Sequence, residues 1–276
     1  MSNTDRYRNY STTNDELCGY LNLYTQSITE KDKLREVYNA LLDENQIGKD
    51  LANRLTDENL ISEVKTWKGS WGYMYDPSTK SIYLSQYPMP EWAYDRYVIM
   101  LGTDSQDNPL WPQRDEMDQY RFLHEVSHAY QYYLVREEAG IEKGQQIPSN
   151  GAEIGTESTF GELLDICHSV RKHFNGSKGL TTWGSQADYD SIQPKEEEIR
   201  KRTIEDANEL VTMYLWNPFY FYKVMEYLAG EIPGYTEQSL HQDRLALITP
   251  YAKQKISRLV NNYVSEMKKN FIYAKK

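Results

Sequence analysis

Two histidines and a glutamate stand close together in the segment His124-Glu125-Val126-Ser127-His128. Residues four apart are neighbours on one side of an α-helix, so the two imidazoles can reach a single metal ion. A zinc ion held by two His and one further ligand keeps a position for water, whose pKa falls to about 7. Glu125 lies about 100° around the helix from His124, where it can take a proton from that water without binding the metal. The pattern therefore predicts a zinc site that activates water.

The same pattern can arise by chance on a solvated helix, where His and Glu are ordinary residues. The chain has only 5 His, however, and two of them stand at this spacing around a Glu. The flanking sequence predicts a helix that begins after Pro112 and ends at Gly140. On the helical wheel His124 and His128 share a face with Gln131, and the residues on the opposite side favour a core: Phe122, Val126, Ala129, Tyr130 and Tyr133.

Two His do not hold a catalytic zinc ion by themselves, so a third ligand is required. The candidates are Glu153, Glu157 and Glu205. Glu153 and Glu157 are a carboxylate pair one helical turn apart, and Glu205 forms a second such pair with Glu209. Both pairs are also compatible with solvated helix glutamates, the commonest environment of this residue. The residues alone leave the choice open.

The segment 203–218, TIEDANELVTMYLWNP, resembles the second motif of small gluzincin-type HExxH metallopeptidases, which include relatives of the anthrax lethal factor protease domain. With the histidine motif, the resemblance spans roughly residues 70 to 218. In that family the first Glu of the motif is the third zinc ligand, and the acidic residue four positions later supports a ligand His. The resemblance assigns these roles to Glu205 and Glu209. It also likens Tyr189 to a tyrosine that stabilises the oxyanion in some members.

Further potential metal ligands are Cys18, Cys167, His168 and His173. No two of them have the i,i+4 spacing of a helical metal pair, so we interpret them as ordinary helix residues rather than a second site. Two cysteines are also too few for a disulfide framework.

The composition excludes several classes of protein. Lys and Arg total 31 against 41 Asp and Glu, which gives a net charge of −10 and makes nucleic acid an unexpected partner. No apolar run approaches the length of a membrane span. The N-terminal segment 1–10 is polar and lacks the apolar core of a signal peptide. We therefore expect a cytoplasmic protein, unless Met1 is not the natural start of an exported one.

The hydrophobic patterns predict an α+β fold that is mainly helical, with a small antiparallel sheet. The family resemblance implies that this sheet packs beside a zincin-like pair of active-site helices. Residues 1–66 are expected to form a helical lead-in, and 67–276 a metallopeptidase domain with a helical insertion at about 140–193. Two expected strands form a hairpin between Gly72 and Leu84, and a third covers 97–101. Further helices are expected from 150 to about 174, from 195 to about 216, and two or three after 219.

These features together predict zinc-dependent hydrolysis of peptide bonds, with a peptide or protein substrate and Glu125 as general base. By family resemblance, the edge of the hairpin is expected to take the substrate as an added strand. One alternative is a catalytically silent zinc-binding or regulatory module, although such a module has no chemical need for Glu125. Another is a helical interaction protein without metal, whose melting temperature zinc would not change. The oligomeric state is not predicted.

Overall fold

The computed structural model of this protein describes residues 27–67, 72–86, 112, 116–138, 140, 158–173, 196–230 and 248–274. The chain divides into two compact units. The first contains the described residues up to 86 together with 116–138 and 140, and the second contains the others. Across the described residues the protein is mainly helical with one small sheet, which confirms the predicted α+β class.

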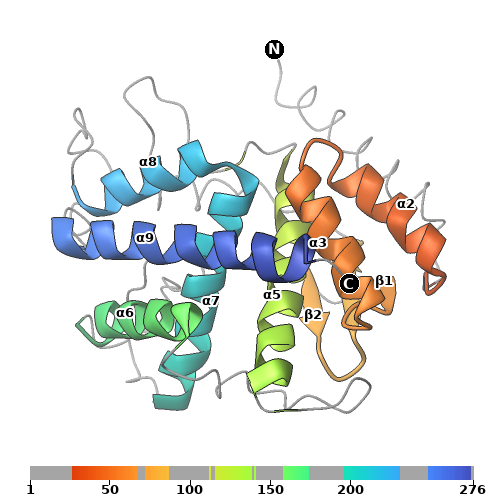
Figure 1. The fold of residues 1–276 in the computed structure, drawn as a ribbon, viewed down its shortest axis with the longest axis horizontal. Helices are drawn as coiled ribbons and strands as arrows, with labels where there is room; N and C mark the ends of the chain where they lie inside the picture. Colours follow the sequence, from red (N-terminus) through yellow and green to blue (C-terminus); the bar gives the residue numbers. More distant parts are fainter. Residues whose placement is uncertain are drawn as a thin grey trace. The chain divides into compact units, whose positions relative to one another are not determined.

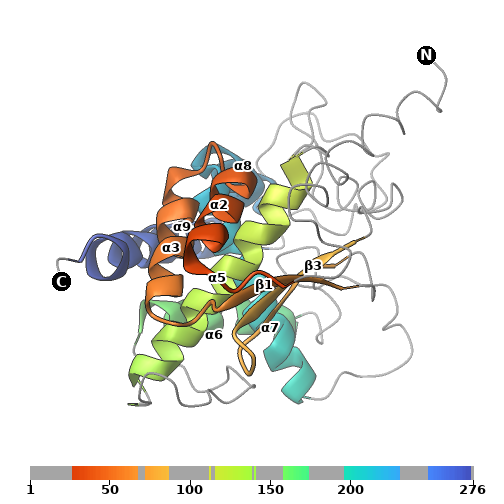
Figure 2. The same ribbon diagram turned by 90° about the vertical axis from the view of Figure 1, so that its right-hand side faces the viewer.

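The described part of the first unit consists of three α-helices and three strands (Figures 1 and 2). They are α2 (Lys31–Leu41), α3 (Gln46–Asp57), β1 (Glu63–Trp67), β2 (Met74–Asp76), β3 (Ser81–Ser85) and α5 (Met117–Glu138). The helices α2 and α3 bury the leucines that gave them their apolar spacing, among them Leu34 and Leu51. Both helices contact α5, and so do β2 and β3. These four elements therefore fix the position of α5.

Helix α3 approaches α5 closely at Gly48. A Cβ at this position would lie 2.9 Å from Cδ1 of Leu123 and 3.3 Å from Cδ1 of Leu42. Leu123 immediately precedes His124, and its side chain is fully buried. The absence of a side chain at Gly48 thus allows α3 to pack against the helical turn that carries His124.

The three strands form one sheet in the order β1-β3-β2, so β2 lies at an edge of the described sheet. β2 and β3 pair antiparallel, with Tyr75 opposite Ile82, which confirms the predicted hairpin. β1 pairs with β3 in parallel, with Val64 opposite Ile82. The sheet is therefore mixed rather than purely antiparallel, because a strand that precedes the hairpin joins it.

Strand β1 occupies a segment that the apolar spacing of Leu60, Ile61 and Val64 predicts to be helical. That prediction is wrong because α3 ends at Asp57, and Asn59 has a φ of 57°. A residue in the left-handed region interrupts a right-handed helix, and the chain continues in extended form. Pairing with β3 then overrides the helical spacing.

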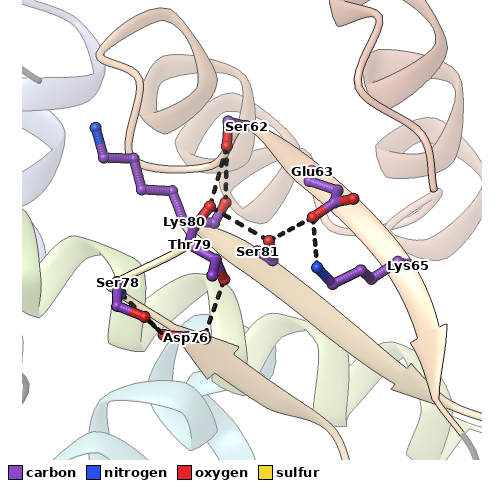
Figure 3. A network of polar contacts seen from close by, with 8 residues as sticks. All are labelled: Ser62, Glu63, Lys65, Asp76, Ser78, Thr79, Lys80 and Ser81. Atoms are coloured by element: carbon purple, nitrogen blue, oxygen red, sulfur yellow. Dashed lines mark hydrogen bonds and ion pairs between the residues drawn. The ribbon is translucent and has the colours of Figure 1, made fainter.

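The turn between β2 and β3 is held by the carboxylate of Asp76 (Figure 3). Its Oδ1 accepts hydrogen bonds from the Ser78 backbone N–H at 2.9 Å and the Ser78 hydroxyl at 2.6 Å, and its Oδ2 accepts one from the Thr79 hydroxyl at 2.9 Å. Burial raises the pKa of Asp76, but these hydrogen bonds outweigh it and hold the pKa below its usual value. Asp76 thereby fixes the turn that determines how β2 lies on β3.

Helix α5 follows the predicted limits closely. It runs from Met117 to Glu138 and stops before Gly140, whose φ of 63° suits a helix end. Of the predicted core side, Phe122, Val126 and Ala129 are fully buried and Tyr130 is buried, whereas Tyr133 is only half-buried. Burial is not confined to this side, because His124, Glu125 and Gln131 are buried as well.

The described part of the second unit contains four α-helices and a short π-helix. They are α6 (Thr159–His173), α7 (Glu196–Trp216), α8 (Pro218–Leu228), α9 (Pro250–Met267) and η5 (Lys268–Ile272). Helix α9 contacts α6, α7 and α8, and Figure 1 shows it running between α6 and α8. The predicted end of α7 is confirmed, because Asn217 caps the following helix by accepting a hydrogen bond from the N–H of Phe219 at 2.9 Å.

Several predicted elements lie outside the described residues: the strand at 97–101, residues 1–26 of the lead-in, and 141–157 and 174–193 of the insertion. The domain boundary between 66 and 67 stays a prediction. Among the helices that the structure describes, none is long and apolar enough to cross a membrane.

Candidate metal site

His124 and His128 face each other from consecutive turns of α5. Their Nε2 atoms lie 3.1 Å apart, and their rings are inclined by 82° with centroids 4.7 Å apart. His124 is buried and His128 is half-buried. At this distance one of the two facing nitrogens donates and the other accepts, because two N–H groups cannot donate to each other. The pair thus brings two potential ligand atoms to one point beside the helix.

Gln131, one turn after His128, contacts the other nitrogen of the His128 ring. Its Oε1 atom lies 3.0 Å from Nδ1 of His128. An amide oxygen can only accept a hydrogen bond, so the Nδ1–H of His128 donates to it. Gln131 is only 4% exposed. Water therefore does not compete easily for this bond.

Glu125 is held by the backbone of strand β2. Its Oε2 atom accepts a hydrogen bond from the N–H of Tyr75 at 2.6 Å, and the side chain is buried. Because Tyr75 lies on the edge strand, this bond satisfies a backbone donor that a sheet edge would otherwise leave unpaired. The carboxylate is thus oriented by an element that is remote in sequence.

Tyr75 is itself anchored at two points. Its hydroxyl donates to the carbonyl of Leu60 at 2.7 Å, and its ring packs against Tyr132 of α5 with centroids 5.7 Å apart. Burial, with smaller contributions from Tyr132 and Asp76, raises the pKa of the Tyr75 phenol. The phenol therefore stays neutral and keeps its proton for the carbonyl of Leu60. These contacts fix the amide that binds Glu125.

Helix α7 carries an unusual set of buried polar side chains. Those that are at most 3% exposed are Thr203, Asp206, Asn208, Glu209 and Thr212. Glu205 is half-buried, one turn before Glu209. The Thr212 hydroxyl donates to the carbonyl of Asn208 at 2.9 Å, a common way for a buried helical hydroxyl to be satisfied. Ala207 and Val211, on the apolar side of the helix, are fully buried, as the spacing predicts.

His124, His128 and Glu205 form a group that could hold a metal ion. One ligand atom from each lies within 4.8 Å of the others. The set combines two imidazole nitrogens with one carboxylate oxygen. These are the three residues that the histidine spacing and the family resemblance selected.

None of the other predicted site residues whose side chains the structure describes joins this group. Glu153, Glu157, Tyr189 and Cys18 lie outside the described residues, as does the side chain of His173. Cys167 is buried, and Nδ1 of His168 lies 3.4 Å from the hydroxyl of Thr203. Among the described residues no second group of three potential ligands occurs.

The sequence showed Gln131 on the histidine face but not its contact with His128. The bond between Tyr75 and Glu125 has no sequence signal, because its donor is a backbone amide.

Comparison with models of protein families, with curated proteins and with solved structures found no match to this chain.

Proposed function

We propose that this protein is a zinc-dependent peptidase, in which His124, His128 and Glu205 hold the metal ion and Glu125 is the general base. The observation that carries the proposal is the gathering of these three potential ligands around the motif that contains Glu125. A group of His and carboxylate ligands can hold several metals, and the proposal of zinc rests on the His-rich set and the HExxH spacing.

The distance between the two histidine Nε2 atoms is suitable for binding a zinc ion. Zinc binds imidazole nitrogen at about 2.0–2.1 Å, and a tetrahedral angle then places two such nitrogens about 3.3 Å apart. The Nε2 atoms of His124 and His128 are 3.1 Å apart. Little movement of the rings is needed for both to bind one ion. With Glu205 as third ligand, a bound zinc ion would keep a position for water or substrate.

Glu125 has the surroundings that a general base requires. Zinc, when bound, supplies a Lewis acid that polarises the scissile carbonyl and acidifies water. Glu125 takes the proton of the attacking water and delivers it to the amine nitrogen of the leaving group. The hydrogen bond from Tyr75 fixes Oε2, so the proton is assigned to Oε1. A base held in this way needs no reorientation when substrate binds.

Strand β2 offers a means of binding the substrate. It lies at an edge of the described sheet, and Tyr75 links it directly to Glu125. Figure 2 shows the sheet beside α5, the helix that carries Glu125. Because the N–H of Tyr75 is bound to Glu125, an extended peptide would pair with this edge beside that amide, and its backbone would lie next to the base. We therefore propose an extended peptide, or an unstructured segment of a protein, as the substrate.

The proposal is tested by hydrolysis of a library of quenched fluorescent peptides. The zinc-loaded protein is expected to cleave some of them, and Glu125→Gln is expected to retain zinc while losing about 10²–10⁴-fold in rate. The matched control is Glu36→Gln, which makes the same change at an exposed position of α2 and should leave the rate unchanged.

Two results would contradict the proposal. Hydrolysis that survives in Glu125→Gln would exclude this residue as the base. A zinc-loaded protein that cleaves no peptide would instead support the catalytically silent zinc-binding module.

A further inference from the structure

We propose that Gln131 is a positioning residue of the metal site, which holds His128 in the one tautomer whose Nε2 can bind the metal. The inference rests on the proposed function, and it assigns unequal roles to the two histidines. His128 is prepared for the metal before it arrives, whereas His124 has to change its protonation pattern.

The first step concerns the His128 ring. Gln131 Oε1, 3.0 Å from Nδ1, accepts the proton of that nitrogen. A neutral imidazole has one N–H, so the Nε2 atom of His128 carries a lone pair. Outer hydrogen bonds of this kind set the tautomer and ring orientation of metal-binding histidines. The bond is local, since the two residues are three apart on one helix, and it is shielded because Gln131 is 4% exposed.

The second step concerns His124. With a lone pair on Nε2 of His128, the contact of 3.1 Å between the two Nε2 atoms requires the Nε2–H of His124 to donate. Both Nε2 atoms must be unprotonated to bind one ion. The proton of His124 therefore moves from Nε2 to Nδ1 of the same ring when the metal binds. This shift changes the tautomer of His124 and releases no net proton.

The alternative is that Gln131 is only a satisfied polar residue of the core. In that case its loss would lower stability without changing the tautomer of His128. The two explanations are separated by nitrogen NMR of histidine-labelled protein, which reports which ring nitrogen carries the proton. The spectra are recorded on metal-free protein at about pH 8, where a histidine of ordinary pKa is neutral.

Three variants accompany the wild-type protein. Gln131→Leu removes the acceptor at similar size, and Gln131→Glu retains an acceptor oxygen. Gln119→Leu makes the same change about three turns earlier on α5, away from the histidine face, and is the matched control. Zinc affinity of each is measured by competition with a chromophoric chelator.

In the wild-type protein we expect His128 with its proton on Nδ1 and His124 with its proton on Nε2. Gln131→Leu should lose the Nδ1–H preference of His128 and bind zinc about 10–100-fold more weakly. Gln131→Glu should keep the tautomer and the affinity, and Gln119→Leu should match the wild type in both.

An unchanged His128 tautomer in Gln131→Leu, or an unchanged zinc affinity, overturns the inference while leaving the proposed function in place. A wild-type protein that binds no zinc overturns the proposed function and the inference that rests on it. Zinc binding by the wild-type protein therefore separates the two failures, because it tests the proposed function without depending on Gln131.

Discussion

The three potential ligands are held by different means. His128 is oriented by a hydrogen bond from its ring to Gln131, whereas His124 is placed by burial and by its contact with His128. Glu205 stands on a helix that carries several buried polar side chains, among them Asp206, Asn208 and Glu209. A half-buried carboxylate among them is well suited to a metal, which compensates the cost of removing its charge from water.

Glu205 is the residue whose role is tested most easily. Glu205→Ala should weaken zinc retention far more than Glu153→Ala, because it removes one of the three atoms that bind the ion. The loss is expected to be at least about 10-fold in affinity, measured by chelator competition. Equal retention by both variants would transfer the role of third ligand to the Glu153 and Glu157 pair.

At this scale the sequence predicts the histidine pair well, since i,i+4 spacing on a helix determines which side chains meet. Glu205 could not be chosen from spacing alone and needed the family resemblance. The partner of Glu125 was not predictable, because any residue other than proline supplies the same backbone N–H as Tyr75.

Among the elements, the hairpin of β2 and β3 has the most direct influence on the site. Its edge strand carries the amide that binds Glu125, and the Asp76 turn determines its register. The Asp-Pro turn and its aromatic flanks made this hairpin predictable. Strand β1 was not predictable, because its parallel pairing with β3 is a non-local contact that local spacing does not encode.

The turn leads to a prediction about pH. The pKa of Asp76 is lower in the folded protein than its ordinary value, so the ionised carboxylate stabilises the fold. This contribution is fully present above the ordinary Asp pKa of about 3.9 and is lost as pH falls through the lower folded pKa. Asp76→Asn should reduce the free energy of unfolding by about 0.5 kcal/mol at pH 7, a small value because the carboxylate is partly exposed.

Urea denaturation at a series of pH values measures this effect. The difference between wild type and Asp76→Asn should shrink as the pH falls below about 4. Asp43→Asn, at an exposed position, is the matched control and should show little difference at any pH. If the difference in the free energy of unfolding between wild type and Asp76→Asn stays constant below pH 4, the negative charge of Asp76 does not stabilise the turn.

For the whole molecule, the sequence predicted a mainly helical α+β protein, and the hydrophobic spacing was sufficient for that because helices dominate. The hydrophobic spacing could not predict which segments form each of the two compact units, since the first unit combines segments that are far apart in the chain. The proposed metal binding is likewise a property of the folded chain, because its ligands are far apart in the sequence. A metal that binds only the folded state must stabilise it.

The central claim is that the folded chain binds zinc through the histidine pair, and metal content tests it most directly. Protein purified without chelator is analysed by elemental mass spectrometry beside His128→Ala and the control His168→Ala. The account predicts about one zinc ion per chain in the wild type and in His168→Ala, and none in His128→Ala. Absence of zinc from the wild-type protein, even after zinc is added back, would contradict it.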